Sequence, residues 1–140
     1  MMSFILPVRV YLEDTDAQGV VYNASYFRFF ERARTEWLRV QGIDHNSLRE
    51  LAGISLVLSE IEASFRVPAQ LDDMLHVSAE LAKVSAVRFI FNQSARRESP
   101  DGELLCKAVA EVACVDAETG KPQRLPPDLV ADLRINEPEE

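Results

Sequence analysis

The sequence of 140 residues has few cysteines and little positive charge. Its two cysteines, Cys106 and Cys114, are eight positions apart in one apolar run, so a strand would place them on the same face but too far apart for a disulfide. The 15 Lys and Arg against 23 Asp and Glu give a net charge of −8, which argues against nucleic-acid binding because phosphates require a basic surface. We therefore predict two buried thiols in a reducing cytoplasm and no nucleic-acid partner.

Long hydrophobic runs and metal-ligand patterns are also missing. No window approaches the roughly eighteen apolar residues of a membrane-spanning helix, and the N-terminus MMSFILPVRV does not look like a signal peptide. The two histidines, His45 and His76, and the distant cysteines do not have the spacing of a zinc site. We predict no membrane segment, no metal and no cofactor. The composition, 47% hydrophobic, is that of a globular protein, and we expect a single domain over residues 1–140.

The spacing of apolar residues predicts one strand, one long helix and then more strands. Apolar and polar residues alternate from Phe4 to Leu12, which indicates a half-buried strand. From about Ala24 to Val40 the apolar spacing becomes three and four, with aromatic residues in one stripe, and Gly42 is suited to end this helix. The later elements are expected to be strands over 57–67, 75–81, 87–97 and 104–115, a short helix over 45–53 and a helical turn beginning near residue 127.

This order predicts an α+β architecture in which one helix packs against an antiparallel meander formed by the later strands. A single helix leaves the far face of the sheet and one edge uncovered. Because an uncovered edge presents unpaired backbone groups, we expect the protein to associate with copies of itself.

The stretch EDTDAQGVVYNASY, residues 13–26, fits neither a strand nor a helix. Asp14, Asp16 and Gly19 match the first half of an EF-hand calcium loop, but the twelfth position is Ser25 instead of the required Glu, and the preceding segment is a strand. We therefore exclude a calcium loop. In a second interpretation the two acids form a turn and Asn23 or Ser25 caps the helix.

A third interpretation makes the stretch catalytic. The first backbone N–H groups of a helix are unpaired and carry a partial positive charge, so they can hold the oxyanion formed when an ester or thioester carbonyl is attacked. A carboxylate from the adjoining loop, such as Asp16, can attack that carbonyl or activate a water. The spacing is compatible with both the capping and the catalytic interpretations.

The sequence from Val8 to Arg39 resembles the signature of the 4-hydroxybenzoyl-CoA thioesterase family of hotdog-fold enzymes, and within it the Tol-Pal-associated acyl-CoA thioesterase branch. The resemblance implies a hotdog fold, in which an antiparallel sheet of about five strands wraps one long central helix. The matching residues are Asp14, Asp16, Gly19, Val20, Val21, Tyr22, Ala24, Tyr26 and the run from Phe30 to Arg34.

The resemblance also implies an acyl-CoA thioesterase that releases free acid and CoA from a short-chain or aromatic acyl-CoA. Asp16 is then the catalytic carboxylate, as nucleophile or general base, and the backbone N–H of Asn23 polarises the thioester carbonyl. The active sites are expected between the subunits of a homodimer or homotetramer. The substrate-binding candidates are Gly19, Val21, Tyr22 and Tyr26, with Arg88 as a candidate for the CoA phosphates.

Two positions depart from the pattern of this branch, which usually has His at Asn23 and Gly at Gln18. A backbone donor survives the first change, but a histidine that assists proton transfer or orients substrate does not. Two other functions compete with hydrolysis: a hotdog hydratase, which usually presents a histidine, and a non-catalytic acyl-binding or envelope-complex partner. On the helix, Glu31 is a weaker candidate acid, and we expect it to form an ion pair with Arg34.

Overall fold

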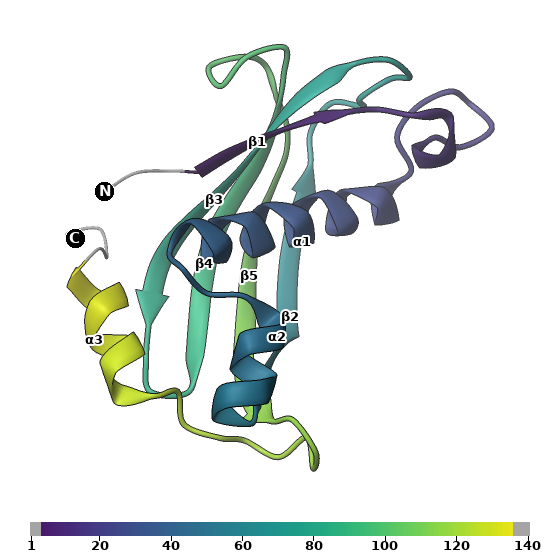
Figure 1. The fold of residues 1–140 in the computed structure, drawn as a ribbon. Helices are drawn as coiled ribbons and strands as arrows, with labels where there is room; N and C mark the ends of the chain where they lie inside the picture. The colour runs from purple at the N-terminus through teal and green to yellow at the C-terminus, as the bar shows by residue number, and fades with distance from the viewer. Residues whose placement is uncertain (1–3, 136–140) are drawn as a thin grey trace.

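The computed structural model describes residues 4–135 and consists of a five-stranded antiparallel sheet with one long helix lying across it (Figure 1). The long helix, α1, has an apolar stripe that is buried against the sheet, as its spacing predicts. Among the described residues, no helix is long and apolar enough to cross a membrane. The strands are β1 (Phe4–Arg9), β2 (Ile54–Phe65), β3 (Met74–Val84), β4 (Arg88–Arg97) and β5 (Leu104–Asp116), and the helices are α1 (Asn23–Val40), α2 (His45–Ser47) and α3 (Pro127–Ile135).

The strands lie in the order β1-β3-β4-β5-β2. The expected meander is therefore right for β3, β4 and β5 but wrong for β2, which pairs with β5 instead of β3. The reason is that the segment between Phe65 and Met74 does not form a hairpin. It crosses to the start of α1, where the carbonyl of Ala69 accepts the N–H of Val21 at 2.8 Å. As a result β1 and β2 are the two edges of the sheet.

Helix α1 has the predicted aromatic core and the predicted end. Trp37 meets Phe91 of β4 edge to face, with 5.3 Å between ring centroids. At the C-terminus Gly42 has φ +85°, and the N–H of Ile43 bonds to the carbonyl of Leu38 at 2.9 Å, which is the Schellman arrangement. The residues of the buried stripe are Tyr26, Phe29, Phe30, Ala33 and Trp37.

The smaller elements follow the sequence with one difference. The short helix expected over 45–53 is α2 followed by a π-helical turn at Leu48–Ala52, and α3 begins at Pro127 near the end of β3 (Figure 1). The first strand, however, ends at Arg9 and does not continue to Leu12, which is 75% exposed. The chain turns here because the Asp14 carboxylate accepts the backbone N–H of Tyr11 at 2.9 Å.

Two predictions about buried side chains have different outcomes. Cys106 and Cys114 are both buried and unpaired on β5, as expected. The predicted ion pair between Arg34 and Glu31 is wrong. Arg34 is buried and donates to the side-chain oxygen of Gln93 at 3.0 Å, whereas Glu31 accepts a hydrogen bond from the hydroxyl of a neighbouring threonine. Gln93 completes the contact by donating to the Phe30 carbonyl at 3.0 Å.

Candidate active site

The first acid of the loop, Asp14, ties the loop to the helix. Its buried carboxylate accepts the N–H of Tyr11 at 2.9 Å and a guanidinium N–H of Arg28 at 2.8 Å. Its carbonyl accepts the N–H of Tyr22 at 3.0 Å and the hydroxyl of Ser25 at 3.1 Å. Asp14 is therefore fully engaged in holding the start of α1 against the loop.

The second acid, Asp16, is exposed and held in a tight turn. Its carboxylate atom Oδ1 accepts the N–H of Gln18 at 2.8 Å, and its carbonyl accepts the N–H of Gly19 at 3.0 Å. The Asp16 N–H donates to the carbonyl of Val20 at 2.9 Å. Gly19 has φ +80°, a left-handed conformation that favours glycine, so this residue closes the turn. The backbone around Asp16 is thus fixed while its second carboxylate oxygen has no hydrogen-bond partner among residues 4–135.

The start of α1 differs from the capping interpretation. Tyr22, with extended backbone, occupies the N-cap position, and no side chain of residues 4–135 caps the helix. Asn23 is the first helical residue, and the hydroxyl of Ser25 bonds to Asp14 instead of to a free N–H of the first turn. Within residues 4–135 no acceptor bonds the backbone N–H of Asn23. This donor is therefore free to bind an anionic oxygen, assisted by the helix dipole.

One cleft, with a volume of about 410 Å³, brings Asp16 and Asn23 together. It is lined by three segments: the acidic loop, the first turn of α1, and the end of β2 with the residues that follow. The lining residues are Asp16, Gln18, Val20, Val21, Tyr22, Asn23, Tyr26, Phe65, Arg66, Val67 and Pro68.

A model of the thioesterase-like superfamily matches residues 10–133. The acyl-CoA thioesterase YbgC of Haemophilus influenzae is 42% identical over 129 residues, which are 92% of this chain and 93% of that protein. The chain belongs to the thioesterase-like superfamily. It has the hotdog fold that the signature at residues 8–39 implies.

Solved structures of this superfamily agree with the fold. A probable thioesterase from Bartonella henselae has a TM-score of 0.82 and 35% identity, covering 89% of this chain and 100% of that one. A 1,4-dihydroxy-2-naphthoyl-CoA thioesterase from Synechocystis has a TM-score of 0.83 and 26% identity, covering 98% of this chain and 100% of that one.

Most candidate residues meet in the cleft of this thioesterase-like chain, but Gly19, Arg88 and the weaker candidate acid Glu31 do not line it. Val21, Tyr22 and Tyr26 line the cleft beside Asp16 and Asn23. Gly19 lies behind it in the turn, and Arg88, on β4, forms an ion pair with Glu111 at 3.1 Å. A role for Arg88 in binding CoA phosphates stays a prediction.

The sequence analysis missed the wall of the cleft that follows β2. Phe65 is half-exposed and its ring centroid lies 5.8 Å from that of the buried Tyr26 and 6.4 Å from that of Phe27. Burial raises the pKa of the Tyr26 phenol, and its oxygen accepts the N–H of Ala69 at 3.3 Å. This wall is therefore aromatic at Tyr26 and Phe65, and it also carries the cation of Arg66. Pro68, which ends the strand pattern, was the one local signal of this wall.

Proposed function

We propose that this protein hydrolyses acyl-CoA thioesters to free acid and CoA, as a member of the 4-hydroxybenzoyl-CoA thioesterase family and of its Tol-Pal-associated branch. Its class, thioester hydrolase, follows from the superfamily and from relatives such as the Haemophilus influenzae acyl-CoA thioesterase. The observation that carries the proposal is that Asp16 and Asn23 line one cleft and that the N–H of Asn23 has no acceptor among residues 4–135. Both groups belong to the protein itself, and the proposed reaction requires no cofactor.

The proposed reaction starts with the thioester carbonyl oxygen on the N–H of Asn23. The helix start then stabilises the negative charge that develops on this oxygen. As a nucleophile, Asp16 bonds to the carbonyl carbon, the C–S bond breaks, CoA leaves as thiolate, and water cleaves the resulting anhydride. As a general base, Asp16 takes a proton from a water that attacks the same carbon, and the thiolate leaves and is protonated.

The acyl group is proposed to be short or aromatic. A cleft of about 410 Å³ must also admit the end of the pantetheine arm, which leaves little room for a long chain. Its wall of Tyr26 and Phe65 offers ring faces and edges to an aromatic acyl group. Hydrolysis of 1,4-dihydroxy-2-naphthoyl-CoA by the similar Synechocystis enzyme supports the aromatic option.

The assembly is proposed to be a homodimer or homotetramer with active sites between subunits. This proposal is supported by the edge position of β2 and by large apolar side chains exposed along it and on the adjacent helix, namely Val57, Leu58, Phe65 and Phe27. We further propose one domain over residues 1–140 and a cytoplasmic location, which suits two unpaired thiols.

The alternative functions have less support. A hydratase usually needs a histidine near the helix start, and none of the residues lining the cleft is a histidine. A non-catalytic acyl-binding partner would make Asp16 dispensable, which is directly testable.

The deciding experiment compares thiol release from short, long and aromatic acyl-CoAs by the wild type, Asp16→Asn and the matched control Asp101→Asn. Asp101 is also an exposed aspartate, but it lies in the loop after β4. We expect Asp16→Asn to lose a factor of about 10²–10⁴ in kcat, because it removes the negative charge without changing the size of the side chain. Asp101→Asn should keep wild-type activity. Equal activity of wild type and Asp16→Asn would refute the mechanism in favour of the binding function.

A further inference from the structure

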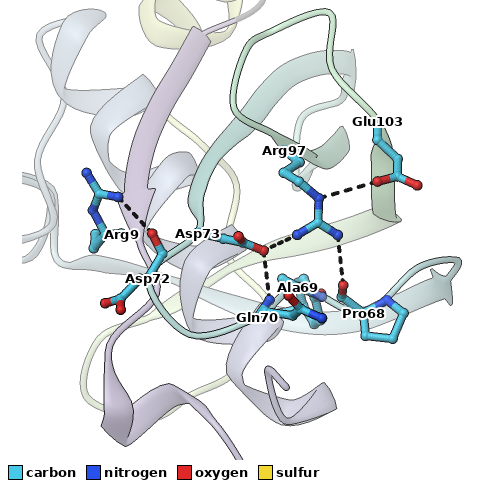
Figure 2. Close-up of polar contacts among 9 residues, drawn as sticks. Arg9, Pro68, Ala69, Gln70, Asp72, Asp73, Arg97 and Glu103 are labelled. Atoms are coloured by element: carbon cyan, nitrogen blue, oxygen red, sulfur yellow. Dashed lines mark hydrogen bonds and ion pairs between the residues drawn. The ribbon is translucent and has the colours of Figure 1, made fainter. Parts of the chain in front are cut away.

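Arg97, the last residue of β4, does not line the cleft and is the centre of a polar cluster (Figure 2). Its Nη1 forms an ion pair with the Asp73 carboxylate, its Nη2 donates to the carbonyl of Pro68 at 3.0 Å, and its Nε donates to Glu103 at 3.3 Å. The Arg97 and Asp73 side chains are 22% and 17% exposed. All three guanidinium nitrogens are therefore occupied by the protein itself, and the pair is largely shielded from solvent.

The contacts of Arg97 help to fix the segment of residues 68–73, which connects β2 to β3. The far end of this segment is also held by Val10, whose carbonyl accepts the N–H of Asp72 at 3.0 Å and whose N–H donates to the carbonyl of Asp73 at 2.9 Å. The Asp73 carboxylate also accepts the N–H of Gln70 at 2.8 Å, which closes the turn on itself. Arg9 of β1 donates to the carbonyl of Asp72 at 2.8 Å (Figure 2). Residues 68–71, however, have one hydrogen bond to a strand of the sheet within the described part of the chain, and it is the bond from Arg97 to Pro68.

The other side of the same segment holds the proposed active site. The carbonyl of Ala69 accepts the N–H of Val21 at 2.8 Å, and the N–H of Leu71 donates to the carbonyl of Gly19 at 3.3 Å. The N–H of Ala69 donates to the Tyr26 hydroxyl at 3.3 Å. Gly19 and Val21 flank Val20, whose carbonyl accepts the N–H of Asp16.

From these contacts we infer that Arg97 is a positioning residue for the Asp16 carboxylate. It clamps the 68–73 segment to the end of β4, and the segment in turn fixes the acidic loop and the first turn of α1. This role rests on the proposed catalytic function of Asp16. Arg97 does not touch the cleft, so its effect is exerted through the backbone of Pro68 and Ala69.

Loss of the clamp acts on geometry more than on substrate binding. Removing Arg97 leaves the Asp73 carboxylate partly buried without its cation and frees the Pro68 carbonyl, so the segment moves toward water. A displacement of about 1 Å at a catalytic group is enough to lower the rate about a hundredfold. Tyr26, Phe65 and the free Asn23 donor lie outside the 68–73 segment and are still present, so KM changes much less than kcat.

The test uses Arg97→Met, which keeps an unbranched apolar stem but removes the guanidinium group and every donor, and Arg97→Lys, which keeps one cation. We expect Arg97→Met to lower kcat by about 10- to 100-fold, with little change in KM. Arg97→Lys should recover part of this loss, because an ammonium group retains the pair with Asp73 but does not also reach Pro68 and Glu103.

Two controls separate positioning from stability. Arg96→Met changes the neighbouring arginine, which bonds to the carbonyl of Gly102 at 2.9 Å and not to the segment. Val112→Ala creates a cavity at the other end of the sheet, beside Phe89, and lowers Tm without touching the site. Both should keep wild-type kcat. A loss of kcat in Val112→Ala equal to that in Arg97→Met would overturn the positioning role.

Amide hydrogen exchange gives a readout that does not depend on activity. The N–H of Val21, bonded to Ala69, should exchange faster in Arg97→Met by about tenfold or more, but not in Arg96→Met. If the wild type is an active thioesterase but the exchange rate at Val21 is the same in Arg97→Met as in the wild type, only the positioning role is overturned. An inactive wild type would overturn the proposed function, and the positioning role with it.

Discussion

The turn that presents Asp16 can be tested with a single methyl group. Gly19 has φ +80°, and a Cβ placed on it meets no atom of residues 4–135 within 4 Å. Gly19→Ala therefore causes no clash, and its cost comes from the backbone alone. Holding alanine in the left-handed region costs about 1–2 kcal/mol, and the stiffer unfolded chain offsets about 0.4–1 kcal/mol of this. The net loss of about 1 kcal/mol corresponds to a fall in Tm of about 2–5 °C.

The loss of activity should be larger than this loss of stability implies. Relieving the strain changes φ at Gly19, and the N–H of this residue closes the turn on the Asp16 carbonyl at 3.0 Å. The carboxylate therefore shifts, and we expect kcat to fall about 10- to 100-fold. Gly120→Ala is the matched control, since Gly120 has φ +74°, equally open space, and an N–H that closes a turn on Asp116 at 2.8 Å.

Thiol release and urea unfolding, measured on both variants, separate the two effects. Both variants should lose similar stability, while only Gly19→Ala should lose activity. If Gly19→Ala kept the wild-type kcat despite the loss of stability, or if Gly120→Ala lost kcat equally, the turn would not position the carboxylate.

Two further predictions concern the edge of the sheet and the buried thiol. Leu58 lies on β2 and is 44% exposed, so Leu58→Glu places a charge on the proposed subunit interface, and light scattering after gel filtration should show a smaller assembly with a lower kcat. The control Leu51→Glu, at a position that is 86% exposed outside the sheet, should change neither the assembly nor kcat. A Leu58→Glu variant that is still assembled or fully active would contradict the prediction. Burial raises the pKa of the Cys106 thiol from 9.0 to about 11. Because the folded state favours the neutral thiol, this contribution to stability is present below pH 9 and is lost as the pH rises toward 11. The free energy of unfolding should therefore fall between pH 9 and 11 in the wild type and less steeply in Cys106→Ala; equal slopes would contradict the prediction.

Local patterns account for the parts of this molecule that could be predicted from the sequence. The stripe of α1 and its end at Gly42 depend on residues within and directly after one helix. Asp16 and Asn23 are seven positions apart, with a turn and a helix start between them, so their proximity also follows from local structure.

Pairings between distant segments could not be predicted in the same way. The Asp72-Asp73 pair resembles a hairpin turn, but Asp73 is bonded to Arg97, which is 24 residues away. The two-residue period of β2 also fails at one point, because a bulge between Leu58 and Glu60 moves Val57 to the face of the sheet opposite that of Ile61. The pattern of one strand does not say which other strand pairs with it, and the register shift in β2 arises from its pairing with β5.

The missing helix cap is the most informative difference between sequence and structure. Propensity favours Asn or Ser as the cap of a helix, yet Tyr22 occupies that position, and the missing side-chain cap costs the helix about 1 kcal/mol. A capping oxygen would have sat over the first turn of the helix, where it would compete with a substrate carbonyl. Instead, the carbonyl of Asp14 accepts the hydroxyl of Ser25, and the N–H of Asn23, a residue that lines the cleft, has no acceptor among residues 4–135. The lower stability of the helix start and its free N–H donor therefore both come from the missing side-chain cap. Such a local loss is expected where a fold leaves a polar group unpaired so that it can bind a ligand.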